Sequence, residues 1–283
     1  MLDSVALVKH EGDVGRALEE GIRLLGGFKV LRSPFIIKPN ICADVVKSRF
    51  AVTDVKVVEA LISLVLRENR NLSVKIVESD SESKFADEAF EKFGYKSLEE
   101  KMGNLGFDVS LVNLSHSPAS PVELDGLYFK NPKLPDLITG SKYFVSVAVA
   151  KTHYLTFITG ALKNLFGLLP RKDQSFYHAS IDEVIVDLNR LVRPDLSIVD
   201  ARVGIEGWEG PTTRRLDTFI LGMNSVCVDA TMARIMRFEP EEIRHLVEAE
   251  KQGLGSLNPE ILGESLKSMT VKFNPPSSFR ARR

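Results

Sequence analysis

Short apolar runs alternate along this chain with stretches in which apolar residues recur every three or four positions. Apolar runs of four to eight residues, bounded by polar or proline-containing segments, are typical of buried strands. Such runs occur at residues 4–8, 34–38, 73–77, 108–112, 143–150, 196–199 and 217–221, with a further short run at 269–273. We therefore expect strands at these positions.

Helical spacing separates most of these runs. A helix is expected after Asp13, and Thr53-Asp54 opens a second one. Further helical patterns lie at about 85–93, 97–105, 181–191, 226–236 and 240–251. Residues 122–129 differ, because Asp125-Gly126 stands between two short β-prone stretches, and this pattern predicts a hairpin.

The alternation of strands and helices predicts an α/β fold with a largely parallel sheet and helices on both faces. The hairpin would add a small antiparallel part. We expect one α/β domain over residues 1–283, because the alternation never stops. Two lobes divided near 113–141 are the alternative.

Composition narrows the classes of partner. The chain has 283 residues, of which 44% are hydrophobic and 27% charged, and a formal net charge of −1. This balance gives no general attraction for nucleic acid or an anionic membrane, so we expect neither as a partner. We expect instead a small anionic molecule, and a homo-oligomer stays open.

Two absences in the sequence predict a cytoplasmic protein. There is no secretory signal pattern, and no apolar run of about 18 residues that could span a bilayer.

The two cysteines, Cys42 and Cys227, lie far apart, which argues against a disulfide scaffold, a structural zinc site and a four-cysteine iron–sulfur cluster.

Polar residues of several kinds follow the predicted strands. They are Lys38 at the end of the second strand and Asn40 after it, Glu78 and Ser79 after the third, Lys151 and His153 after 143–150, and Asp200, Glu206 and Gly207 after 196–199. Ligands of open α/β sheets bind beyond the carboxyl ends of the strands. If the strands are parallel, these side chains converge on one rim and form a catalytic or ligand-binding site.

The stretch from Lys151 to Pro170 carries the densest chemistry. Thr159 and Gly160 are expected to begin a helix whose first N–H groups bind an anion, with Lys163 near that positive end. His153 titrates near neutrality and could be a general acid or base, a metal ligand or a hydrogen-bonding group. His178, at the end of the polar segment 171–179, could close over the site as a second base or lie on the surface.

A set of motifs in order carries a family resemblance. They are Lys38-Pro-Asn-Ile41, Thr53-Asp54, Glu78-Ser79, Lys151-Thr-His153, Thr159-Gly-Ala-Leu-Lys-Asn-Leu-Phe-Gly167, Tyr177-His178, Asp200, and Glu206-Gly207 followed by Gly210-Pro211. Over about residues 4–255 the chain resembles the family called domain of unknown function 362. The resemblance implies no general activity. Some members carry a ferredoxin-type cysteine cluster, which this sequence lacks.

A second resemblance is local. The histidine and tyrosine at 153–154, Thr159-Gly160 and then Lys163 are similar to a run in the nickel-pincer lactate racemase family. This resemblance implies that Lys163 holds or contacts a cofactor and that His153 and His178 handle protons or bind a metal. Leu162 and Asn164 depart from that family's pattern.

The leading hypothesis is an enzyme that binds a small anionic substrate or nucleotide-like cofactor and uses lysine and histidine acid–base chemistry, of racemase, isomerase or lyase type. The catalytic residues would be Lys163, His153 and His178, with a metal ion on the two histidines or a nucleotide-type cofactor left open. The binding residues would be Lys38, Asn40, Asp54, Glu78, Ser79, Lys151, Thr159, Gly160, Asn164, Asp200, Glu206 and Gly207. One alternative is a non-catalytic cofactor- or metal-delivery protein, and another is an iron–sulfur-linked redox protein.

Overall fold

The apolar runs assemble into one mixed sheet in the structure, a computed structural model that describes residues 3–169 and 172–280. Among these residues the sheet has nine strands in the order β11-β1-β10-β9-β7-β2-β3-β4, with β8 paired to β7. The strands are β1 Ser4–Lys9, β2 Phe35–Pro39, β3 Val74–Glu78, β4 Val109–Asn113, β7 Tyr143–His153, β8 Phe157–Thr159, β9 Leu196–Glu206, β10 Thr212–Gly222 and β11 Glu260–Gly263.

Most of the strand pairs are parallel. Strands β9, β7, β2, β3 and β4 follow one another in parallel, and β11 runs parallel to β1. Strand β10 pairs antiparallel with both β1 and β9. A separate two-stranded antiparallel sheet joins β5 Ala119–Pro121 to β6 Lys133–Pro135. The predicted α/β class, largely parallel with a small antiparallel addition, is confirmed.

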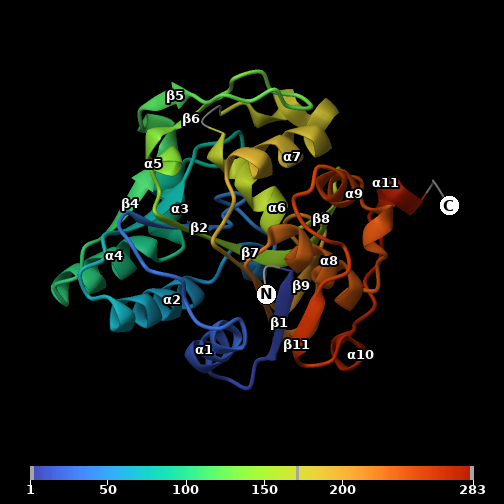
Figure 1. Ribbon diagram of the computed structural model, residues 1–283, viewed down its shortest axis with the longest axis horizontal. Helices are drawn as coiled ribbons and strands as arrows, with labels where there is room; N and C mark the ends of the chain where they lie inside the picture. Colours follow the sequence, from blue (N-terminus) through green and yellow to red (C-terminus); the bar gives the residue numbers. More distant parts are fainter. Residues whose placement is uncertain (1–2, 170–171, 281–283) are drawn as a thin grey trace.

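Helices cover both faces of the sheet, as Figure 1 shows. On one face lie α1 Val14–Leu24, α2 Val55–Glu68, α3 Ala86–Lys92 and α4 Tyr95–Asn104. On the other lie α6 Ala161–Asn164, α7 Ile181–Leu191, α8 Ser225–Ile235 and α9 Arg244–Lys251. Because side chains alternate along a strand, Val5 and Leu7 enter one core while Ala6 and Val8 enter the other.

Shorter helical segments complete the described chain. They are α5 Asp136–Thr139, α10 Leu266–Met269, α11 Ser277–Arg280 and the 3₁₀ turns Arg49–Ala51, Leu114–His116, Leu165–Leu168, Gln174–Ser180 and Pro240–Glu242. No helix within 3–169 and 172–280 is long and apolar enough to cross a lipid bilayer. The organisation as one domain stays a prediction.

The predicted hairpin is present, but its turn lies at 126–129 rather than at Asp125-Gly126, because a distant carboxylate captures this segment. The backbone N–H groups of residues 127–129 all donate to the carboxylate of Asp187, at 2.8–2.9 Å. Gly126 packs so closely that a Cβ there would lie 2.2 Å from Asp187 Oδ2. The segment therefore turns around a buried side chain of α7, and antiparallel pairing extends from this turn, through the bridge between Asp125 and Lys130, to β5 and β6.

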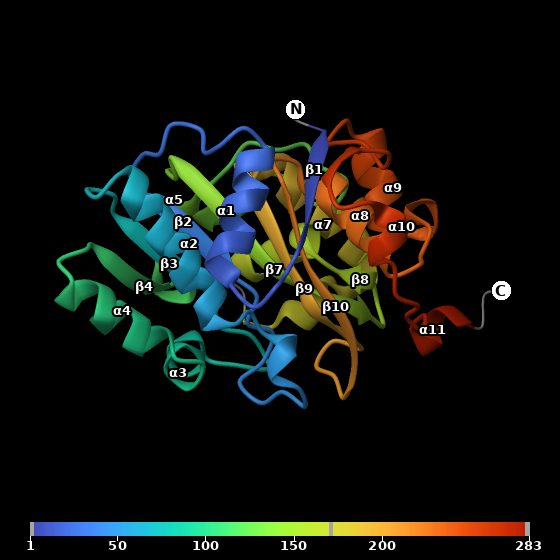
Figure 2. The same ribbon diagram turned by 90° about the horizontal axis from the view of Figure 1, so that it is seen from below.

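The strand predicted at 196–199 does not end there. It continues as β9 to Glu206 and pairs with β10, which begins at Thr212 rather than at 217. Glycine is required inside this long hairpin, because a Cβ on Gly204 would lie 2.5 Å from the ring of Phe273. The hairpin tip projects beside the segment before α2 (Figure 2), where Ser48 N–H donates to the carbonyl of Glu209 at 3.1 Å.

Two further expectations were wrong. Residues 269–273 do not form a strand, since α10 ends at Met269, and the last strand is β11, which adds to β1. The helix expected from Thr159 begins at Ala161, because Thr159 is the last residue of β8. The segment 171–179 contains a 3₁₀ turn from Gln174, and its first residue lies outside the described residues.

We expect Asp187→Ala to destabilise the protein by about 2–4 kcal/mol, because it strands three backbone donors in a buried turn. Urea unfolding measures the loss. Asp125→Asn is the matched control in the same loop, since Asp125 is 85% exposed and its ion pair with Lys130 is worth little. Equal unfolding midpoints for the two variants would contradict this account of the turn.

Candidate functional site

A cavity of about 220 Å³ lies beyond the carboxyl ends of β2, β3 and β7. Neighbouring parallel strands end at the same edge, so residues far apart in sequence meet there. Its polar lining comprises Lys38, Asn40, Cys42, Glu78, Ser81, Glu82, Ser83, Lys84, Lys151, His153, Tyr154, Thr159, Lys163, Asn164, Gln174, His178 and Trp208. Four lysines thus face two glutamates, which leaves an excess of positive charge.

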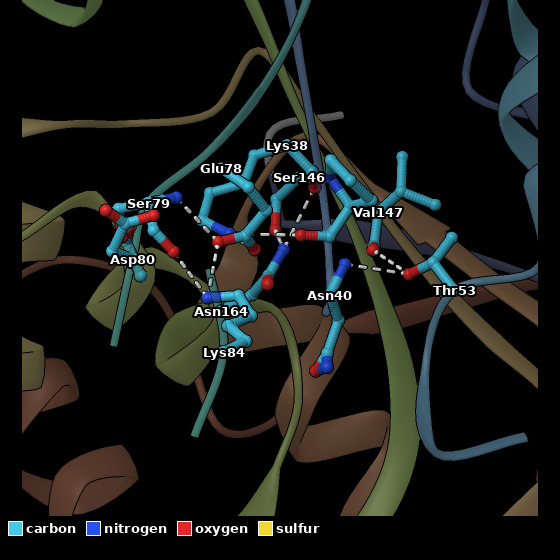
Figure 3. A network of polar contacts seen from close by, with 12 residues as sticks. Lys38, Asn40, Thr53, Glu78, Ser79, Asp80, Lys84, Ser146, Val147 and Asn164 are labelled. Carbon is cyan, nitrogen blue, oxygen red and sulfur yellow. Dashed lines mark hydrogen bonds and ion pairs between the residues drawn. The ribbon is translucent and has the colours of Figure 1, made fainter. Parts of the chain in front are cut away.

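Glu78 is shared by two buried lysines at the floor of the cavity (Figure 3). One carboxylate oxygen pairs with Lys38, and the other lies 3.1 Å from Lys84 Nζ. Burial alone would raise the pKa of Glu78, but the charges of Lys38 and Lys84 outweigh burial and hold that pKa below its ordinary value. Burial lowers the pKa of Lys38, against the attraction of Glu78.

Three further hydrogen bonds join this floor to its surroundings, and two of them reach the 161–168 segment from Lys38 and Ser79. Asn164 Nδ2 donates to the carbonyl of Lys38 at 3.1 Å and to Ser146 Oγ at 3.0 Å. Ser79 Oγ donates to the carbonyl of Gly167. A Cβ on Gly167 would lie 2.8 Å from Lys38 Nζ, so only glycine allows this approach. The ion-paired floor therefore fixes where the 161–168 segment lies.

Lys151, near the end of β7, is held by backbone. Its ammonium donates to the carbonyls of Ala51 at 2.9 Å and Trp208 at 3.1 Å. Thr152 Oγ1 accepts from the N–H of Gly207 at 2.8 Å. The tip of the β9–β10 hairpin is thus fastened to β7 and forms one wall of the cavity.

Lys163 differs from the other three lysines. Among the described residues its ammonium makes no hydrogen bond or ion pair, and its Nζ lies 5.3 Å from the centroid of the Phe166 ring. Burial lowers the pKa of Lys163 to about 8, helped by the charge of Lys151 and opposed by Cys42. A neutral amine is therefore accessible near physiological pH.

His153 is buried, and its ring has a defined tautomer. The N–H of Leu155 donates to Nδ1 at 3.1 Å, so the neutral ring carries its proton on Nε2. Burial, and then the charges of Lys163 and Lys151, hold the pKa of His153 well below its ordinary value. At neutral pH the ring is an uncharged hydrogen-bond donor, and it stacks on Tyr154 with the ring centroids 4.9 Å apart.

His178 is half-buried and lies between the main cavity and a second one. Burial and the charge of Lys163 lower the pKa of His178, while Glu82 and Asp173 oppose that shift. The charge of Lys163 lowers the pKa of both His153 and His178, in agreement with the position of all three side chains in the lining of one cavity.

Residues 36–234 match the family described as "Domain of unknown function (DUF362)". The chain belongs to this family. It is also 23% identical over 279 residues to the thylakoid-associated protein sll1697 of Synechocystis sp., a match that covers 92% of this chain and 83% of that protein.

Two solved structures are distantly similar to this DUF362 protein. The lactate racemase apoprotein of Thermoanaerobacterium thermosaccharolyticum matches with a TM-score of 0.48 and 10% identity, over 82% of this chain and 58% of that chain. A Thermotoga maritima protein matches with a TM-score of 0.34 and 12% identity, over 68% and 50%. The chain thus spans little more than half of the racemase chain.

The start of α6 in the DUF362 protein is already occupied, contrary to the expectation of an external anion there. The N–H groups of Ala161 and Leu162 donate to the two carboxylate oxygens of Asp229, at 2.7 and 2.9 Å. A Cβ on Gly160 would lie 2.1 Å from the same carboxylate. Gly160 therefore serves internal packing, and Thr159 Oγ1 is buried without a partner among the described atoms.

Several predicted binding residues lie away from the cavity. Asp54 and Asp200 both pair with Arg202, at 3.1 and 2.7 Å, because β9 runs past Asp200 instead of ending before it. Glu206 pairs with Arg214 at 2.9 Å and accepts from Asn274. Gly207 is bound to Thr152, and Ser79 lies under the cavity floor.

Other lining residues were missed from the sequence. Lys84 comes from the turn after β3. Its place in a serine-rich polar loop is the one signal for it in the sequence. Trp208 arrives on the hairpin tip, and Cys42, which the sequence gives no reason to select, follows Asn40 by two residues. Both cysteines are free, with Cys42 half-buried and Cys227 buried in α8.

The metal and nucleotide cofactors left open do not fit this DUF362 cavity. A metal on His153 Nε2 needs the proton on Nδ1, which instead faces the N–H of Leu155. No group of three or more histidine, cysteine or acidic side chains within 3–169 and 172–280 could hold a metal ion. The volume of about 220 Å³ lies below the roughly 300–1,000 Å³ of ordinary ligand pockets, which favours a molecule smaller than a nucleotide.

We expect Glu78→Gln to destabilise the protein by about 3–5 kcal/mol, because it leaves two buried ammonium groups without their carboxylate. The depressed pKa of Glu78 makes its contribution complete above the ordinary carboxyl pKa, and the contribution is lost as pH falls through the lower folded value. Urea unfolding from pH 3 to 8 should therefore show a flatter acid limb for the variant.

Glu82→Gln is the control for that series, since Glu82 lines the same cavity but is exposed. Adding Lys84→Met to Glu78→Gln should recover part of the stability, because it removes one unpaired charge. A Glu78→Gln variant as stable as Glu82→Gln at pH 7 would show that the shared carboxylate is not a main stabiliser.

We expect the Lys163 amine to titrate with a pKa of about 8, being protonated below that pH and neutral above it. The ¹³Cε resonance of Lys163, assigned by its loss in Lys163→Met, measures this directly. The lysine resonances that persist in Lys163→Met serve as the internal reference in the same spectrum. A midpoint above pH 10 for Lys163 would contradict the account.

Proposed function

We propose that this protein is an enzyme that binds a small anionic molecule in the cavity and moves a proton at a carbon next to its carbonyl group. One observation carries the proposal. Lys38, Lys84 and Lys151 are each held by a carbonyl or by Glu78, whereas Lys163 has no acceptor among the described residues.

The proposed step uses groups that already face the cavity. Neutral Lys163 accepts the proton from carbon, and the electron pair of the broken C–H bond moves toward the carbonyl oxygen. His153 Nε2–H then donates a hydrogen bond to the developing oxyanion. The neutral imidazole already carries its proton on Nε2, so it can donate this bond without a change of protonation state. Return of the proton from the Lys163 ammonium completes the exchange. In an isomerase- or racemase-like variant, protonated His178 donates a different proton to the carbon, and the Lys163 ammonium then loses its proton to solvent.

The electrostatics of the cavity support an anionic substrate. Lys38 and Lys84 together outweigh the single charge of Glu78, and Lys151 adds another cation close to Lys163. In a partly buried cavity such charges act more strongly than in water. They would bind a carboxylate and stabilise an enolate on the same molecule. A cytoplasmic location is part of this proposal, supported by two cysteines that are both free.

Proton exchange in D₂O tests the proposal whatever the product of the reaction is. The protein is incubated with a panel of small 2-oxo acids and oxo-diacids, and ¹H NMR follows loss of the proton next to the carbonyl. We expect Lys163→Met to lower the exchange rate by roughly 10²–10⁴-fold, the usual contribution of a general base. Exchange should rise with pH through about 8, as Lys163 becomes neutral.

Lys56→Met is the matched control, because Lys56 is exposed and lies outside the cavity. It should exchange like the unmodified protein. Tight binding of panel members with no exchange would favour instead the delivery-protein alternative. Exchange that persists in Lys163→Met would remove Lys163 from the proposed role.

A further inference from the structure

The backbone of Asn40 is held in place, while its side chain makes no hydrogen bond with any described residue. Its backbone is clamped on both sides by Thr53, since Asn40 N–H donates to Thr53 Oγ1 and Thr53 N–H donates to the Asn40 carbonyl, both at 2.8 Å. The hydroxyl of Thr53 is fixed in turn by donating to the carbonyl of Val147 at 2.8 Å. Asn40 is therefore tied to both β2 and β7.

The carboxamide of Asn40 does not take part in this clamp. The residue as a whole is 95% buried and lines the cavity, yet its carboxamide makes no hydrogen bond with any described residue. Figure 3 shows it pointing away from the other labelled side chains. Buried carboxamides are normally hydrogen-bonded, so a preorganised and unpartnered one at a cavity wall is suited to a ligand.

The remaining free groups of the cavity are mostly donors. A lysine ammonium has three N–H groups. Lys38 uses two, on Glu78 and the carbonyl of Pro39, and Lys84 uses two, on Glu78 and the carbonyl of Ser79. Lys151 uses two on the carbonyls of Ala51 and Trp208, so each lysine keeps one N–H group. Lys163 and His153 Nε2–H add uncommitted donors. Such an array matches a ligand with several acceptor oxygens.

The charge count indicates how many negative charges that ligand carries. With Lys163 neutral as the proposed base, the buried lining residues Lys38, Lys84 and Lys151 stand against buried Glu78, and this leaves two positive charges when these four groups are ionised. Glu82, the other acidic lining residue, is exposed to solvent. A monoanion would leave one of them uncompensated in a partly buried space, whereas a dianion balances both.

We infer that the substrate is a small dianion, a dicarboxylate or a phosphate monoester, and that Asn40 binds one of its acidic groups through Nδ2. The inference rests on the proposed function, because it names the substrate class of the same cavity, but it is tested by binding alone. The volume of about 220 Å³ limits the dianion to a few carbon atoms.

Two charge ladders of nearly constant shape test the inference by isothermal titration calorimetry at pH 7. One is succinate, succinamate and succinamide, and the other is ethyl phosphate against diethyl phosphate. We expect affinity to fall by at least about tenfold for each charge removed. The ladder that binds more tightly distinguishes a dicarboxylate from a phosphate ester. Equal affinity along both ladders would overturn the inference.

Asn40→Asp provides the second arm. It keeps the shape of the side chain, removes the Nδ2 donors and lowers the cavity charge by one, so dianion affinity should fall roughly 10- to 100-fold or more. The neutral succinamide should be much less affected. Asn71→Asp, an exposed position with the same change of charge, should bind like the unmodified protein. An unchanged dianion affinity in Asn40→Asp would overturn the role of Asn40.

The two proposals fail separately. Dianion binding that follows the ladder, without exchange in D₂O, would support the substrate class and overturn the enzyme. Exchange of a 2-oxo acid with no preference for two charges would support the enzyme and overturn the dianion. The charge ladders are measured on the unmodified protein and do not depend on the folding of Asn40→Asp. They therefore test whether the ligand is a dianion even if that variant is unstable.

Discussion

The carboxylate of Glu78, shared by Lys38 and Lys84, is the interaction on which the rest of the site depends. It keeps the ammonium groups of Lys38 and Lys84 buried beside the ends of β2 and β3. The chain passes so close to Lys38 Nζ at Gly167 that this position has no room for a side chain. That passage sets the course of the 161–168 segment, and with it the place of Lys163 against the cavity. The ion pairs of Glu78 thus determine the position of the Lys163 amine, although Lys163 is not a member of those ion pairs.

The lysines of the cavity differ in how they are held. Lys38, Lys84 and Lys151 are fixed in place by carbonyls or by Glu78. Lys163 has no such partner among the described residues, and burial together with the charge of Lys151 lowers its pKa to about 8. Under the proposed function, the three fixed lysines would supply the positive field and Lys163 the base, and the local hydrogen bonds distinguish the two roles.

The sequence predicted those parts of the fold and site that depend on local pattern. The apolar runs located seven of the nine described sheet strands at least in part, the short β8 and β11 being missed, and residues at the ends of β2, β3 and β7 met in one cavity because parallel strands end together. It failed where a contact spans a long stretch of chain. Asp187 and Asp229 capture backbone N–H groups about 60 to 70 residues away, and neither capture leaves a periodic signal. Asp200 was misplaced because polar residues in a long hairpin read as a loop.

The hairpin tip carries the only tryptophan of the chain, Trp208, whose carbonyl holds Lys151 at the cavity wall. The interior of the sheet and both cores contain no other indole. The intrinsic fluorescence of this protein is consequently a local optical probe. Its emission reports polarity and quenching at one wall of the cavity, and does so in the native chain without any label.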